Sequence, residues 1–207
     1  NNGFGAHRIE GIGDKHVPWI HNVKNTDMVM AIDDEAPMAI IRLFNEPAGK
    51  KYLVNQGVSE ELVEALPQLG ISCVANVLSA IKFAKYYELG ENDVVMTVLT
   101  DSMEMYQSRL VELTEERGEF TDLDAAGAYH QHLMGTTIDY VEELTYYGRK
   151  RVHNLKYYTW VEQQGKSYEE IQAQWYDDNY WTDLHGHVDE MDALINEFNE
   201  KTGLLKD

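Results

Sequence analysis

Hydrophobic positions in the first 110 residues follow two patterns. Met28–Ile32 and Val94–Leu99 are short continuous apolar runs, which are typical of strands buried on both faces. Val74–Tyr87 instead has an apolar residue at every third or fourth position, which predicts an amphipathic helix. Because buried strands that alternate with helices build parallel sheets, residues 1–110 are expected to form an α/β domain.

Capping residues predict where the other helices of this region begin and end. Asp33–Glu35 offers an N-cap and a negatively charged first turn, with Pro37 just inside the helix and Pro47 ending it. Ser59 is expected to cap a helix over Glu60–Leu66. Both helices lie between the two predicted strands, as in an α/β fold.

Helical signals dominate the rest of the chain, so residues 111–207 are expected to form a mostly helical extension. A Ser-x-x-Glu capping box, Ser167 with Glu170, marks one helix start. The helices expected in this part are Leu123–Met134, Ile138–Tyr147, Arg149–Gln164, Ile171–Tyr176 and Val188–Thr202. This extension carries 14 of the 22 aromatic residues, which is too many for a disordered tail.

Charge and cysteine content exclude several classes of partner. The 207 residues carry 17 basic and 36 acidic side chains, a net charge of −19, which argues against nucleic acid and against an anionic membrane surface. No run of 18 apolar residues is present, and no basic stretch is followed by an apolar one, so neither a membrane span nor a signal peptide is expected. The single cysteine, Cys73, suits a reducing compartment, so a cytoplasmic protein is expected.

Two short motifs carry candidate chemistry. Gly11 and Gly13 flank Ile12, and glycines let the backbone approach a ligand closely, although the same pattern also occurs in plain turns. Ser102 follows the apolar run Val94–Leu99, where the carboxyl end of a parallel strand would face a ligand. Its alternative role is the N-cap of the helix expected through Tyr106–Glu116.

Three segments taken together resemble a known family. HRIEGIGDKHVP, LGISCVANVLSAIKFA and VVMTVLTDSMEMYQSRL occur in this order, beginning at residues 7, 69 and 94. This order is similar to the second half of the cysteine synthase and cystathionine β-synthase family, the fold-type II pyridoxal-phosphate enzymes. The resemblance covers residues 3–110 and implies part of a three-layer, parallel-sheet domain like that of the tryptophan synthase β subunit. The later run LTYYGRKRVHNLKYYTWVEQQG resembles the extension of long bacterial homologues called pyridoxal-phosphate-dependent protein β subunits.

The resemblance implies specific cofactor contacts. Ser102 matches the serine that hydrogen-bonds the pyridine nitrogen of pyridoxal phosphate, and Gly11, Ile12 and Gly13 match the backbone wall beside cofactor and substrate. A neutral hydroxyl at the ring nitrogen suits β-elimination or β-replacement on a cysteine- or serine-like amino acid. Tyr106 matches a family tyrosine and is expected only to pack.

The sequence departs from the family in ways that matter. Cys73 and Val74 replace a serine and a glycine, Thr100 replaces a proline, and residues 50–68 look like an insertion. The family's Schiff-base lysine and phosphate-binding loop are not recognised, so no catalytic residue is assigned. The chain is therefore expected to be the C-terminal half of a longer homodimeric enzyme, inactive without its N-terminal half.

Two other interpretations stay open. A non-catalytic assembly module would use the acidic, aromatic extension to join subunits. A metal site at His185 and His187 is the weakest alternative, because an His-x-His pair occurs often in solvated helices, and no metal ligand is assigned. Arg149, Lys150 and Arg151 form a basic cluster that could bind an anion, although salt bridges to acidic helices are the simpler expectation.

Overall fold

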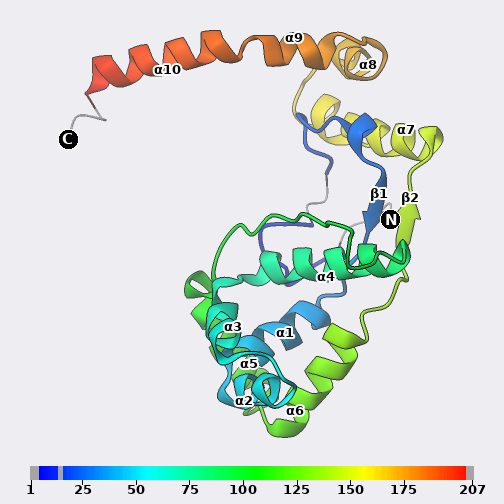
Figure 1. Cartoon of the computed structure of the whole chain (residues 1–207). Helices are drawn as coiled ribbons and strands as arrows, with labels where there is room; N and C mark the ends of the chain where they lie inside the picture. Colours follow the sequence, from blue (N-terminus) through cyan, green and yellow to red (C-terminus); the bar gives the residue numbers. More distant parts are fainter. Residues whose placement is uncertain (1–4, 14–15, 204–207) are drawn as a thin grey trace. The chain divides into compact units, whose positions relative to one another are not determined.

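A computed structural model describes residues 5–13 and 16–203, and these residues are mostly helical (Figure 1). The described part of the chain contains one sheet, of two antiparallel strands. The prediction of a three-layer α/β domain with a parallel sheet is therefore wrong. No single helix among the described residues combines the length and hydropathy needed to cross a membrane.

The chain divides into two compact units. Unit 1 comprises Asn1–Lys15 and Val29–Glu142, and unit 2 comprises His16–Met28 and Glu143–Asp207. This division differs from the boundary expected at residue 110, which falls inside a helix of unit 1. Each unit draws on two separate stretches of sequence, whereas the composition change near residue 110 suggested one stretch for each.

Unit 1 is a helical bundle around an apolar core. Its α-helices are α1 (Glu35–Asn45), α2 (Pro47–Asn55), α3 (Glu60–Ala65), α4 (Ile71–Tyr86), α5 (Gln107–Arg117) and α6 (Asp122–Gly127), with the 3₁₀ helices η2 (Leu66–Gln68) and η3 (Met103–Tyr106) and the π-helix η4 (Ala128–Met134). Helix α1 packs against α2, α4 and η4. Met38, Ile41, Leu43 and Ile71 are fully buried between them, as the apolar face of each amphipathic helix requires.

The predicted helix caps are largely confirmed in unit 1. The Oδ1 atom of Asp33 accepts a hydrogen bond from the backbone N–H of Glu35 at 2.9 Å, at the start of α1. Ser59 Oγ accepts from the backbone N–H of Leu62 at 3.3 Å, at the start of α3. Pro47 follows the end of α1 as expected, but it also begins α2, which the sequence patterns did not predict. A proline is suited to a first turn because its missing N–H has no partner there.

The two-stranded sheet pairs β1 (Met28–Met30) with β2 (Val141–Glu143). Within unit 1, the N–H of Ala31 donates to the carbonyl of Tyr140 at 3.1 Å. The buried Lys82 of α4 donates from Nζ to the carbonyls of Ala31 at 2.9 Å and Asp139 at 2.8 Å, which holds the ends of these strands. The helix predicted over Ile138–Tyr147 is therefore wrong, because its middle, Val141–Glu143, is a strand paired with β1.

The strand predicted at Val94–Leu99 is also absent from the described structure. This segment is irregular, and its apolar side chains lie open to solvent: Val94 is 89% exposed and Met96 is 91% exposed. One contact ties it to α4, a hydrogen bond from Asn76 Nδ2 to the carbonyl of Val98 at 2.8 Å. A strand buried on both faces needs neighbouring strands and covering helices, and the described residues supply neither to this segment.

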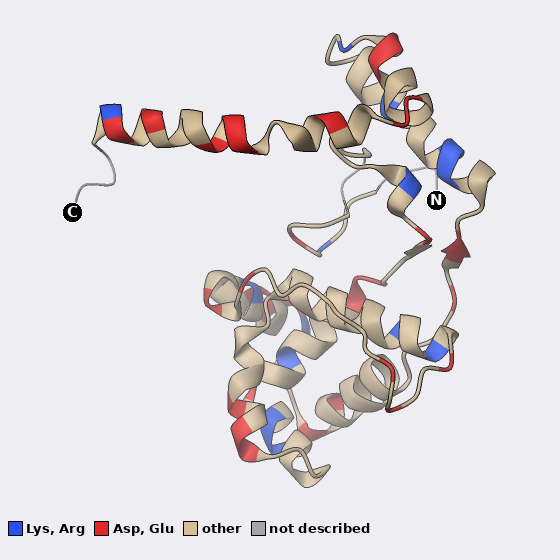
Figure 2. Cartoon of the chain, turned by 45° about the horizontal axis from the view of Figure 1, so that its top comes forward, with Lys and Arg blue, Asp and Glu red and all other residues tan. Residues whose placement is uncertain are grey.

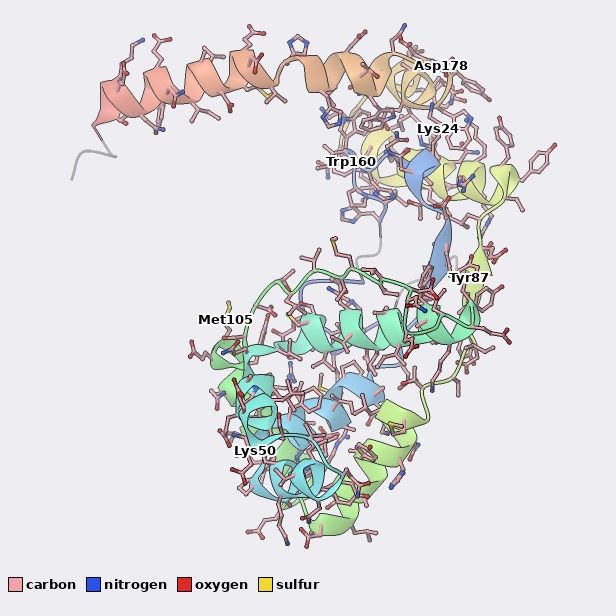
Figure 3. All side chains as sticks on the ribbon, viewed as in Figure 1. Lys24, Lys50, Tyr87, Met105, Trp160 and Asp178 are labelled. Atoms are coloured by element: carbon pink, nitrogen blue, oxygen red, sulfur yellow. The ribbon has the colours of Figure 1, made fainter. Side chains whose placement is uncertain are left out.

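Unit 2 is helical and rich in aromatic residues. Its elements are η1 (Val23–Asn25), α7 (Tyr146–Asn154), η5 (Tyr157–Val161), α8 (Tyr168–Tyr176), α9 (Tyr180–Gly186) and α10 (Val188–Thr202). Ser167 caps α8 through the N–H of Glu170 at 3.1 Å, and Gly203 ends α10 with φ of 68°, as predicted. All four tryptophans lie in this unit, and Trp160 donates from Nε1 to the carbonyl of Val17 at 2.8 Å (Figure 3).

Two basic side chains are enclosed in the core of unit 2. Lys156 is fully buried and donates from Nζ to the carbonyls of Trp19 and His21 and to Oε1 of Gln174, each at 2.8 Å. Burial lowers the pKa of Lys156 to about 8. His153, 1% exposed, hydrogen-bonds through Nε2 to the carbonyl of Ile171 at 3.0 Å, and burial lowers its pKa to about 4.

Candidate functional site

The carboxylate of Asp101 lies at the N-terminus of α4. Gly70, the N-cap residue of this helix, donates its N–H to the carbonyl of Asp101 at 3.1 Å. A Cβ atom added to Gly70 would lie only 2.1 Å from Asp101 Oδ1, so the carboxylate occupies the space beside the glycine. The free N–H groups and the dipole of a helix N-terminus favour a negative charge at this position.

Hydroxyl groups surround the Asp101 carboxylate. Tyr106 donates from its phenol to Oδ2 at 2.6 Å, and Ser72 lies with its Oγ 2.9 Å from Thr100 Oγ1 and 3.5 Å from Asp101 Oδ1. The hydrogen bond to Asp101, helped by desolvation, raises the pKa of Tyr106 to about 12. The phenol therefore stays protonated and remains a hydrogen-bond donor throughout the physiological range.

Cys73 is a buried member of this group. Its side chain is fully enclosed, and its Sγ lies 3.2 Å from the carbonyl of Asp101 and 3.4 Å from Oδ1. The backbone N–H of Thr100 points at the sulfur at 3.1 Å. Since Sγ is both covered and hydrogen-bonded, the thiol helps to fasten Thr100 and Asp101 to α4, and it is not placed to attack a substrate.

The glycine segment Gly11–Gly13 also contributes to this site, because Gly11 lies beside Ser72. Gly11 has φ of 86°, and a Cβ atom added to it would lie 3.9 Å from Ser72 Oγ. Ile12 is 39% exposed, and Gly13, with φ of 81°, would bring a Cβ within 3.2 Å of the His7 ring. The positive φ values explain the two glycines, because side chains strain this backbone conformation.

Ser102 follows directly after the Asp101 network. It is half-buried and occupies the N-cap position of η3, where its carbonyl accepts from the N–H of Met105 at 3.2 Å. Its hydroxyl accepts no capping hydrogen bond in the turn, and it forms no hydrogen bond with any other residue that the structure describes. Ser102 thus has the position of an N-cap but leaves its hydroxyl available.

A cavity of about 480 Å³ opens on the other side of Thr100 and Asp101. Its remaining walls come from α3, η2 and the residues beside them: Leu62, Ala65, Leu66, Gln68, Leu69 and Leu99. The sequence suggested no binding role for this stretch, which counted only as an insertion relative to the family. The spacing of Leu62, Leu66 and Leu69 on one helical face was the available signal.

The histidines of the C-terminal region do not form a metal centre. No group of three or more His, Cys, Asp or Glu side chains converges on one point among the described residues. His187 lies on the surface, with Nδ1 3.2 Å from Glu190 Oε2, one helical turn away. Arg149, part of the basic cluster noted in the sequence, pairs with Asp27 and donates from Nε to the carbonyl of Thr26 at 2.8 Å.

The arrangement at α4 is therefore a hydrogen-bonded group around one carboxylate, with a glycine turn on one side and a free serine hydroxyl on the other. These residues can hold a polar ligand and orient it through neutral donors. They supply no activated nucleophile of their own. No family model, no curated protein and no solved structure matches this chain.

Proposed function

We propose that this chain contributes the Ser102 side of a pyridoxal-phosphate site, in an enzyme that performs β-elimination or β-replacement on a cysteine- or serine-like amino acid. One observation carries the proposal. Gly11, Ser72 and Thr100 belong to the three segments that resemble the cysteine synthase family, and Gly11 and Thr100 both lie beside Ser72, although 89 residues separate them from each other. A chance set of turn and capping motifs gives no reason for these segments to meet.

The free hydroxyl of Ser102 supports this assignment. Pyridoxal phosphate, when bound, supplies an electron sink for the carbanion formed at the substrate's α-carbon. A serine hydroxyl can donate a neutral hydrogen bond to a ring nitrogen, which tempers that sink and favours chemistry at the β-carbon. Asp101, the residue before Ser102, is hydrogen-bonded to Tyr106, Ser72 and Cys73. These contacts fix the position of the Ser102 hydroxyl.

The glycine segment supports the same role by its shape. Gly11, Ile12 and Gly13 are exposed, Gly11 lies beside Ser72 of α4, and the two glycines have no side chains of their own to keep a flat ring or an amino-acid carboxylate from the backbone. The lysine that binds the cofactor and the loop that holds its phosphate belong, on this proposal, to an N-terminal half of the same cytoplasmic enzyme. The exposed apolar side chains of Val94–Leu99 offer that half a surface to cover.

The experiment compares the complete protein, encoded with its upstream sequence, with two serine variants. The complete protein should bind pyridoxal phosphate and show its visible absorption, and Ser102→Ala should shift this band and reduce turnover. Ser108→Ala, an exposed serine six residues later on α5, should change neither. A complete protein that binds no pyridoxal phosphate would refute the proposed function, and a band unaltered in Ser102→Ala would refute the role of the serine.

A second candidate function, an assembly module that joins copies of the chain, is favoured by α10. Leu184, Val188, Met191, Ile195 and Phe198 recur at intervals of four and three residues, and each is between 43% and 59% exposed. Acidic residues follow the rest of the helix, with one lysine near its end (Figure 2). Such a stripe is an amphipathic helix face without a partner among the described residues.

Light scattering after size-exclusion chromatography tests this second function. If α10 joins subunits, Ile195→Asp should convert an oligomer to a monomer, because it places a charge in the middle of the apolar stripe. Asn196→Asp adds the same charge to an exposed position one residue away and should leave the mass unchanged. A monomeric unaltered chain, or an oligomer that survives Ile195→Asp, would exclude α10 as the contact.

A further inference from the structure

A pocket of about 580 Å³ opens within unit 2, far in sequence from the site at α4. Helix α7, the turn η5 and helix α8 form its walls. Its lining includes Tyr147, Lys150, Arg151, Tyr158 and Tyr168. The volume falls in the range of sites that hold small organic molecules, about 300–1,000 Å³.

Tyrosines make up the largest part of this wall. Tyr147 is 81% exposed, Tyr158 is 60% exposed and Tyr168 is 50% exposed, although each has a large apolar ring. Leu155 and Ile171 add aliphatic surface between them. Tyrosine rings present a flat apolar face and a hydroxyl at the edge, a combination that suits stacking against a planar ring with polar substituents.

The charge of the lining is the reverse of the charge of the chain. The protein carries a net charge of −19, yet the pocket is lined by Lys150 and Arg151 and by no aspartate or glutamate. Asn154 and Gln172 add neutral amide donors to this wall. A ligand that gains from such a lining carries a negative group, because cations attract it and no carboxylate repels it.

Lys150 is the unexplained residue of the pocket. Its Nζ is buried and has no hydrogen-bond partner among the described residues. The ammonium lies instead over two aromatic rings, 4.6 Å from the centroid of Trp175 and 4.3 Å from that of Tyr176, and burial lowers the pKa of Lys150. The two rings compensate part of the lost hydration, but the three N–H donors stay unused, which is unfavourable for a buried cation.

We infer that this pocket binds a small aromatic anion, a planar ring bearing a carboxylate or a phosphate group. The ring lies among the tyrosines, and Lys150 and Arg151 hold the anionic group. In the bound state the flexible side chain of Lys150 turns away from the rings of Trp175 and Tyr176, which lie outside the pocket lining, and its ammonium donates to the anionic group of the ligand. This inference stands independently of the proposed pyridoxal-phosphate site.

Calorimetric titration of the full chain measures separately how much the aromatic ring and the anionic group of the proposed ligand contribute to binding. The probes are phenyl phosphate and phenylacetate, which combine ring and anion, inorganic phosphate, which has no ring, and benzylamine, which has the ring with a positive charge. Phenyl phosphate, phenylacetate or both should bind saturably with one site per chain, and each should bind more tightly than inorganic phosphate or benzylamine. Equal binding of inorganic phosphate and both aromatic anions, or no binding of either aromatic anion, would overturn the inference.

Variants then locate the site. Lys150→Met and Tyr158→Ala should each weaken the binding of the aromatic anion about tenfold or more, as expected when a charged hydrogen bond or a stacked ring is lost. Lys201→Met removes a lysine of equal charge from the exposed surface of α10 and should leave the affinity unchanged. Arg151→Gln removes the other positive charge of the lining and provides an independent charge variant. Undiminished affinity in a folded charge variant would refute the site.

Discussion

Lys156 donates a hydrogen bond to Oε1 of Gln174 at 2.8 Å, and both side chains are almost entirely enclosed in unit 2. The same ammonium satisfies the carbonyls of Trp19 and His21, which precede η1 in the sequence. One buried cation thereby joins the two stretches of chain that form unit 2. Burying a charge costs least when all of its donors find acceptors, as those of Lys156 do.

Lys156→Met should therefore destabilise unit 2. The substitution leaves the carbonyl of His21 and Oε1 of Gln174 without the donor they have in Lys156, whereas the carbonyl of Trp19 keeps a hydrogen bond from Gln174 Nε2 at 3.3 Å. We expect a loss of about 2 kcal/mol in the free energy of unfolding, less any gain from removing the buried charge. Urea unfolding at pH 7, followed by tryptophan fluorescence, measures this loss, because all four tryptophans lie in unit 2. Lys150→Met, which leaves no acceptor unsatisfied, is the matched control and should not destabilise the unit.

His153 should make unit 2 less stable in mild acid. Its pKa is about 4 in the folded protein, because of burial, against an ordinary value of 6.5. Between these values the unfolded chain binds a proton that the folded chain does not, so stability is complete above pH 6.5 and is lost as the pH falls toward 4. The expected difference between pH 7 and pH 5 is about 2 kcal/mol.

Urea unfolding at the two pH values, with tryptophan fluorescence as the signal, tests this expectation. His153→Gln should remove the histidine's share of the pH dependence while keeping a donor for the carbonyl of Ile171. His185→Gln alters an exposed histidine of α9 and should leave the pH dependence unchanged. If the free energy of unfolding changed with pH by the same amount in His153→Gln as in the unaltered chain, the His153 imidazole would not be held neutral in the folded protein.

Local sequence signals predicted the helices of this protein well. The bounds expected for Val188–Thr202 are those of α10, and Ser59 and Ser167 cap the helices assigned to them. Capping and amphipathic spacing depend on a few neighbouring residues, so they can be read without knowledge of the fold. Non-local pairing is different: Val141–Glu143 forms a strand only because Met28–Met30 lies beside it, and no signal within Ile138–Tyr147 indicates that partner.

Val94–Leu99 shows the limit of the hydrophobic pattern most clearly. Its composition favours a buried strand, but burial depends on elements that the pattern cannot supply. Gly11, a candidate from the sequence, lies beside Ser72, and so does Thr100, which the sequence marks only as a departure from the family. The carboxylate of Asp101 at Gly70 was not expected, because its role arises from the meeting of a turn and a helix start that lie 31 residues apart.

The pair formed by Asp101 and Tyr106 gives a test of the network at α4. Tyr106→Phe removes the 2.6 Å hydrogen bond to the carboxylate and should lower the stability of unit 1 by about 1.5–3 kcal/mol, the usual range for a hydrogen bond to a charged group. Far-UV circular dichroism during thermal or urea unfolding measures it. Tyr140→Phe, at an exposed tyrosine of the same unit, should have no comparable effect.

The pKa of Tyr106 provides an independent measurement of the same contact. In the unaltered chain the phenol should titrate at about 12, because its hydrogen bond to Asp101 and its desolvation both disfavour the phenolate. Asp101→Asn removes the negative charge and should move this pKa down toward 10, the ordinary value for tyrosine. Nuclear magnetic resonance of labelled tyrosine side chains follows the change, and a pKa of 12 that persists in Asp101→Asn would assign the shift to burial alone.

Two glycines of unit 1 should respond to the same substitution in opposite directions. A Cβ at Gly70 would lie 2.1 Å from Asp101 Oδ1 and 3.2 Å from Tyr106 Cε2. The carboxylate cannot simply move aside, because Tyr106, Ser72 and Cys73 hold it, so Gly70→Ala should destabilise unit 1 by about 1–3 kcal/mol.

Gly127 is the matched control. It is the last residue of α6, has helical backbone angles and leads directly into η4, and a Cβ there would meet nothing within 4 Å. Alanine loses less backbone entropy on folding than glycine, so Gly127→Ala should stabilise unit 1 by about 0.5–1 kcal/mol. Unfolding of both variants at the same pH, followed by circular dichroism, measures their free energies of unfolding against that of the unaltered chain. If Gly70→Ala were as stable as Gly127→Ala, the Asp101 carboxylate would not occupy the start of α4 as described.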